Sequence, residues 1–122
     1  MQEKREHQRV SFEVETIVEL VGQPREEGNA SETVSGKTVS GKTVDISVGG
    51  LFVESPEPLE IGTQVVVSLS LPGVDSAKLP GFVRWVKPNG WGIQFGLLGV
   101  RETHAIGKVV RRAQLVRGTG NS

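Results

Sequence analysis

The chain has 122 residues, in which 14 lysines and arginines balance 14 acidic residues, and it contains no cysteine. This length fits one domain with a single modest core. The zero net charge excludes a global field that would draw the protein to nucleic acid or to an acidic membrane. The lack of cysteine excludes disulfides, thiolate metal sites and cysteine nucleophiles, and it fits a reducing compartment. No apolar stretch reaches the length of a membrane span and the first residues form no signal region, so we expect a cytoplasmic protein without membrane insertion.

The N-terminal region divides into a polar arm and a strand. Residues 1–9 are charged and have no apolar periodicity, so we expect a mobile arm. From Val10 to Leu20 apolar residues alternate with serine and glutamate, and only Ile17 interrupts the polar side. This alternation predicts a half-buried strand.

A polar loop at 22–33 leads to an exact duplication of Ser-Gly-Lys-Thr-Val, at 35–39 and at 40–44. Strand side chains alternate with period two, so equivalent residues of the two copies face opposite sides of a regular strand unless a bulge intervenes. We expect the second copy to enter a strand over 43–46 and the first to form a hairpin or a strand edge. The duplication also creates a G-x-x-x-x-G-K-[ST] match at 36–43. That motif binds phosphate only between a buried strand and a helix, and here a strand follows it, so we reject this function.

The rest of the chain predicts four further strands and a helix. A turn at 48–50 precedes a strand from Leu51, and alternation predicts a strand over 65–71. A final hairpin joins 79–87 to 91–96 across Pro88-Asn89-Gly90, since Asn-Gly favours tight hairpin turns. Apolar residues then take helical spacing, with basic residues on the solvated side. We expect a helix over 101–117, docked on the strands because Gly107 costs it about 1 kcal/mol, and a disordered tail at 118–122.

These elements predict a mainly β fold, a small six-stranded antiparallel β-barrel over 10–100 with a C-terminal α-helix. We expect Trp85 and Trp91 to pack in the barrel or against the helix. The alternative for one of them is an exposed position at a partner surface.

Two short motifs carry the functional prediction. Arg5 and Arg9 form R-x-x-x-R, and Asp45, Ser47 and Gly50 form D-x-S-x-x-G at a strand–turn–strand corner. Two guanidinium groups can present two forks to one planar, anionic ligand. An acid, a hydroxyl and a bare backbone corner can read the edges of a base.

The two motifs, in this order, resemble those of the PilZ domain family, bacterial receptors for the second messenger cyclic di-GMP. Gly81-Phe-Val-Arg-Trp85 and Gly92-Ile-Gln-Phe95 fit the strand pattern of that family, so the resemblance covers most of the chain. It implies a PilZ-like split barrel. It also implies that the site for cyclic di-GMP consists of Arg5, Arg9, Asp45, Ser47, Gly49 and Gly50.

The resemblance assigns each of these residues a role. The arginines can bind guanine O6/N7 or phosphate, and Asp45 can accept from guanine N1–H and the exocyclic amine. Ser47 can bond a phosphate oxygen or a base amine. Gly50, with Gly49 sharing the duty, lets the backbone approach closely and take a turn conformation that a β-carbon would disfavour.

Two functions follow from this resemblance. In the first, cyclic di-GMP orders the arm and switches a protein-interaction surface. In the second, the domain is an adaptor that binds proteins without responding to the ligand. We expect no enzymatic activity, because His7 and His104 have no triad or ligand partners at a recognisable spacing. We also expect no metal, no cofactor and no nucleic acid. The protein partner, the ligand stoichiometry and the choice between monomer and homodimer stay open.

Overall fold

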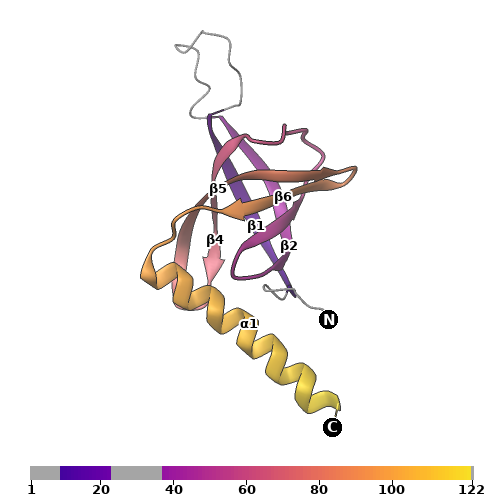
Figure 1. Cartoon of the computed structure of the whole chain (residues 1–122), viewed down its shortest axis with the longest axis vertical. Coiled ribbons are helices and arrows are strands. Elements are labelled where there is room, and N and C mark those ends of the chain that lie inside the picture. Colours follow the sequence, from indigo (N-terminus) through magenta and orange to yellow (C-terminus); the bar gives the residue numbers. More distant parts are fainter. Residues whose placement is uncertain (1–8, 23–36, 122) are drawn as a thin grey trace, which may run out of the picture.

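The computed structural model describes residues 9–22 and 37–121, with side chains up to 113 (Figure 1). The predicted arm, apart from Arg9, and nearly all of the predicted loop at 22–33 lie outside the described residues. The elements are β1 (Val10–Gly22), β2 (Thr38–Ile46), β3 (Gly50–Glu54), β4 (Gln64–Leu71), β5 (Val74–Lys87), β6 (Gly90–Phe95) and α1 (Val100–Asn121).

The six strands form a closed barrel in the order β1-β2-β3-β6-β5-β4, and every neighbouring pair whose register is resolved is antiparallel. The predicted fold class is therefore confirmed. The predicted final hairpin also forms between β5 and β6, although Pro88 and Asn89 are its two turn residues and Gly90 already belongs to β6.

The core fills the barrel with aliphatic side chains and one tryptophan. Val18, Leu51 and Val67 are fully buried. Trp91 is 1% exposed, and its indole N–H donates to the carbonyl of Glu57 at 2.8 Å. The predicted barrel position of Trp91 is thus confirmed. In β1 the side chains of Val10, Val18 and Leu20 are buried, whereas Ile17 is exposed, as the alternation predicted.

The tandem repeat lies mostly within one strand. β2 begins at Thr38, inside the first copy. The predicted strand over 43–46 was therefore too short at its N-terminal end. Equivalent side chains of the two copies face opposite sides of the strand. Val39 is buried, whereas its counterpart Val44 lies on the outer face. Thr38 is exposed, whereas its counterpart Thr43 is buried. Period-two alternation gives this result for a five-residue repeat. The strand conformation also leaves no helix after the G-K-T sequence, as expected.

The helix α1 contacts β1, β4 and β5 with its first turns. Ala105, Ile106 and Val109 are buried against the barrel, and the C-terminal end projects away from it (Figure 1). The helix continues to Asn121, so the predicted end at 117 and the disordered tail were wrong for residues 118–121. Gly118 and Gly120 suggested a break, but glycine only disfavours a helix by about 1 kcal/mol and does not forbid it. Within the described residues, no helix has the length and apolar character needed to cross a membrane.

Candidate ligand pocket

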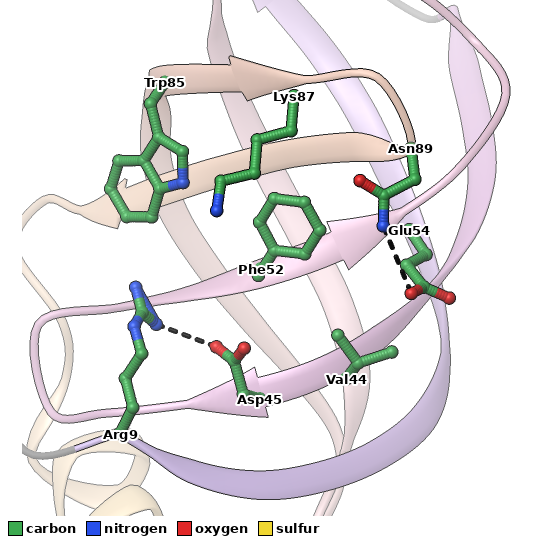
Figure 2. Close-up of a pocket in the computed structure, with 8 residues that line it drawn as sticks. All are labelled: Arg9, Val44, Asp45, Phe52, Glu54, Trp85, Lys87 and Asn89. Atoms are coloured by element: carbon green, nitrogen blue, oxygen red, sulfur yellow. Dashed lines mark hydrogen bonds and ion pairs between the residues drawn. The ribbon is translucent and has the colours of Figure 1, made fainter.

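A pocket of about 760 Å³ lies on the outer face of the barrel. Figure 2 shows the side chains around it, which come from the residue before β1, from β2, β3 and β5, and from the β5–β6 turn. Its lining residues are Arg9, Val44, Asp45, Phe52, Glu54, Trp85, Lys87 and Asn89. A pocket of this size with a few convergent polar groups can bury a small ligand.

Between the pocket-lining strands β3 and β5 lies β6, which has glycines at two positions beside the pocket residues. Gly92 of β6 pairs with Phe52 of β3 on one side and with Trp85 of β5 on the other. Gly90 pairs in the same way with Glu54 and Lys87. A Cβ on Gly92 would collide with the Trp85 indole. Gly92 therefore lets the Trp85 indole pack against β6, and Gly90 lets the Val53 carbonyl of β3 approach closely.

Two β-bulges turn polar and aromatic side chains toward the pocket. In β2 the pairing with β3 skips Val44, so Asp45 faces outward opposite Phe52 while Ile46 returns to the core. In β5 the pairing with β6 skips Arg84, so Trp85 faces outward although Val83 is fully buried. A bulge inserts one residue and shifts the alternation of the strand. Without these two insertions, Asp45 and Trp85 would point into the barrel.

Arg9 connects the two sides of the pocket. Its Nη1 donates a hydrogen bond to Oδ1 of Asp45 at 2.8 Å. Its guanidinium carbon lies 5.3 Å from the centre of the Trp85 ring, within cation–π distance. The side chains of Arg9 and Asp45 stay 35% and 32% exposed. Exposed ion pairs contribute about 1 kcal/mol or less, so a ligand can open this pair at small cost.

Burial and charge act in opposite directions on Asp45. Partial burial raises the pKa of its carboxyl above the ordinary value of 3.8, and the nearby charges of Arg9 and then Lys87 lower it. The net pKa is raised. The carboxylate is thus partly desolvated and depends on neighbouring donors, which suits a group that accepts hydrogen bonds from a ligand.

Ser47, Gly49 and Gly50 form the corner between β2 and β3 and do not line the pocket. Ser47 is 3% exposed. Its Oγ accepts from the amide of Gly49 at 3.1 Å, and its own amide donates to the carbonyl of Gly50 at 2.8 Å. The carbonyl of Gly49 accepts from the amide of Phe95 at 2.9 Å, which ties the corner to β6. These bonds hold the corner that positions Asp45.

Gly50 is required for a different reason from the one predicted. In the described residues a positive φ occurs only at Gly62 and Gly73, so the predicted special turn conformation of Gly50 is wrong. Instead, a Cβ on Gly50 would collide with the backbone carbonyl of Ile93 in β6. The close approach is between two strands of the barrel.

Of the residues predicted for the site, Arg9 and Asp45 meet in the pocket, and Arg5 lies outside the described residues. The prediction that Trp85 packs in the barrel or against the helix is wrong, because its ring lines the pocket. Sequence reasoning also missed Phe52 and Lys87. One signal was available, because a two-residue turn at Pro88-Asn89 pairs Lys87 with Gly90 and, counting back, Trp85 with Gly92.

A sequence model of the PilZ domain matches residues 3–112. The chain belongs to the PilZ family. PilZ domains form a family of cyclic di-GMP receptor domains. No curated protein sequence matches the chain.

Two solved structures share the fold of this PilZ domain. The Bacillus subtilis inhibitor of motility, MotI/DgrA, superposes with a TM-score of 0.68 at 16% identity, over 93% of this chain and 53% of that protein. The chain therefore spans about half the length of MotI/DgrA. The PilZ domain of CeSA from a cellulose-synthesizing bacterium superposes with a TM-score of 0.59 at 17% identity, over 90% of this chain and 98% of that one.

The corner of this PilZ domain should not tolerate a side chain at Gly50. We expect Gly50→Ala to lower the free energy of unfolding by about 1–3 kcal/mol, because the added methyl must push β3 away from the Ile93 carbonyl. Gly96→Ala is the matched control, since its Cβ would lie 3.7 Å from its nearest neighbour, the Pro80 carbonyl oxygen. Thermal and urea denaturation of both variants test this. Equal stability of the two would show that the corner has room to relax.

The raised pKa of Asp45 should depend on Arg9. We expect Arg9→Gln to raise this pKa further and Lys87→Gln to raise it less, because both cations favour the carboxylate and Arg9 has the larger effect. Since the folded-state pKa lies above 3.8, the stabilisation from Asp45 is present below that pH and is lost as the pH rises through the folded-state value. NMR titration of the Asp45 carboxyl carbon measures these shifts. An unchanged pKa in Arg9→Gln would mean that the ion pair does not form in solution.

Proposed function

We propose that this PilZ domain is a receptor for cyclic di-GMP and that the pocket on its outer face is the binding site. The observation that supports the proposal is the contact between Arg9 and Asp45. These residues belong to two separate motifs, 36 positions apart, and they meet at 2.8 Å beside an aromatic ring.

The chemistry of the pair suits guanine. A guanidinium group and the guanine N1–H/N2 edge both offer adjacent N–H donors to a carboxylate. Asp45 already accepts such a donor from Arg9. In the proposed complex guanine takes the place of Arg9 at Asp45, which adenine cannot do because it lacks this pair of donors. Arg9 then becomes available for guanine O6/N7 or for a phosphate.

The aromatic residues and the remaining motif residues complete the proposed site. The face of Trp85 offers a stacking surface for a purine, worth about 1–3 kcal/mol per base. Arg5 supplies a second guanidinium. In this proposal Ser47, Gly49 and Gly50 act chiefly by holding the corner under Asp45, while Ser47 contacts the ligand only if the corner opens.

Arg9 is the residue through which ligand binding would affect the N-terminal arm. It is the residue at which the arm joins β1, so a ligand that separates Arg9 from Asp45 changes how the arm leaves the barrel. We propose that binding orders residues 1–9 over the ligand and thereby creates or hides a surface for a protein partner. The ordering entropy is offset by charged hydrogen bonds of about 1.5–3 kcal/mol each.

Calorimetric titration tests the receptor function. We expect wild-type protein to bind cyclic di-GMP and to discriminate against cyclic di-AMP and GTP. Arg9→Ala should weaken binding roughly ten- to a hundredfold, because one charged hydrogen-bonding group is lost. Arg101→Ala is the control, since Arg101 is an exposed residue of α1 that does not line the pocket.

Two results would contradict the proposal. Absence of heat and of competition at tens of micromolar (an order-of-magnitude limit) would reject ligand binding and favour the adaptor that acts through proteins alone. Equal losses in Arg9→Ala and Arg101→Ala would reject this pocket as the site.

The two tryptophans provide an optical test of where the ligand binds. Trp85 lines the pocket, whereas Trp91 is buried in the core. We expect cyclic di-GMP to quench the fluorescence of wild type and of Trp91→Phe, because a stacked purine contacts the Trp85 ring. Trp85→Phe should lose the quenching. Quenching that persists in Trp85→Phe would place the ligand elsewhere.

A further inference from the structure

Lys87 is a charged residue of the pocket that belongs to neither sequence motif. It is the last residue of β5 and pairs with Gly90 of β6. Its side chain lines the pocket. Its Nζ lies 5.7 Å from the centre of the Phe52 ring in β3. Figure 2 shows the ammonium group pointing into the pocket between Trp85 and Phe52.

The charges around the pocket leave Lys87 available for an anion. Arg9 is paired with Asp45, and Glu54 accepts a hydrogen bond from the Asn89 amide at 3.3 Å. Among the described residues, no carboxylate lies within ion-pair distance of the Lys87 ammonium. Its charge nevertheless acts at Asp45, where it lowers the pKa after Arg9 does.

We propose that Lys87 is a phosphate-binding residue of this pocket, held in place by the barrel before the arm engages the ligand. The inference rests on the proposed function and adds a contact from β5 to those from the arm. A cyclic dinucleotide carries two phosphates, so it needs cations beyond the one that faces Asp45. Lys87 supplies one from a strand whose position is fixed by the β5 bulge and the pairing with Gly90.

Lys87 could instead have a purely structural role, in which its methylene stem covers Phe52 and the ammonium remains in water. The two roles predict different effects of removing the charge while the apolar stem is kept. Lys87→Met keeps an unbranched apolar stem over Phe52 and removes the charge, while Lys87→Arg keeps the charge. The matched control is Lys78→Met, an exposed lysine of the same strand that does not line the pocket.

The experiment measures cyclic di-GMP affinity for wild type and these three variants at low and high salt, with thermal melting to verify folding. We expect Lys87→Met to bind about three- to tenfold more weakly at low salt, and the difference to shrink at high salt, because the contact is exposed and screened. Lys87→Arg and Lys78→Met should stay within about twofold of wild type, as expected for changes that leave the contact intact.

The possible failures are distinguishable. If wild type binds and Lys87→Met binds as Lys78→Met does, the role of Lys87 is wrong while the receptor function stands. If Lys87→Met is weaker by a factor that salt does not change, the lost contact is packing and the phosphate role is wrong. If wild type does not bind, the receptor function fails and the role of Lys87 fails with it.

Discussion

The Trp85 ring can pack over the neighbouring strand only where that strand has a stretch without side chains, because pleated strands otherwise carry side chains on both faces of a sheet. In this PilZ domain β6 provides that stretch. Gly92 lies between Phe52 and Trp85, and Gly90 lies between Glu54 and Lys87. A methyl group at Gly92 would occupy the place of the Trp85 indole. The position of the Trp85 ring in the pocket wall therefore depends on the absent side chain of Gly92, while the absent side chain of Gly90 makes room for the Val53 carbonyl.

The second requirement is a shift in the alternation of inward-facing and outward-facing side chains along β2 and β5. Regular alternation would send Asp45 and Trp85 into the core, where an unpaired carboxylate would be costly and the interior is already closely packed. The bulges at Val44 and Arg84 shift the alternation by one residue, so that Asp45 and Trp85 face outward. Both strands still contribute to the core, β2 at Ile46 after its bulge and β5 at Val83 before its bulge, since both side chains are fully buried. A carboxylate and an aromatic ring are thus placed on the outer face without loss of the apolar interior.

The arginine of the pocket links this rigid frame to the N-terminal arm. Arg9 contacts Asp45 on one side and Trp85 on the other, so it occupies the two groups that we propose for guanine. The ion pair is partly exposed and therefore weak. It keeps the carboxylate hydrogen-bonded without blocking its exchange for a ligand. In the proposed function, this exchange is the step that couples the pocket to the arm.

Local sequence patterns were sufficient to predict the strands, the helix and the fold class. Alternation in β1 and helical spacing in α1 depend on neighbouring residues, and the Pro88-Asn89-Gly90 segment marks the hairpin. The two motifs predicted that Arg9 and Asp45 belong to one site. The roles of Trp85 and Gly50 were misread for the same reason, since both depend on which strand lies alongside. Trp85 faces outward because of a bulge, and Gly50 is small because the Ile93 carbonyl lies against it.

The sequence by itself thus determined the elements, the barrel class and the two halves of the motif, because each is encoded over a few adjacent positions. Only the tertiary structure decided which side chains share the pocket. That depends on the pairing of β3 and β5 with β6 and on the two bulges, which bring together residues far apart in the chain. The register of non-local strands is set by the packing of the whole barrel. For this reason the local sequence could not assign Phe52, Trp85 and Lys87 to the pocket, and only the strand pairing of the closed barrel places them there.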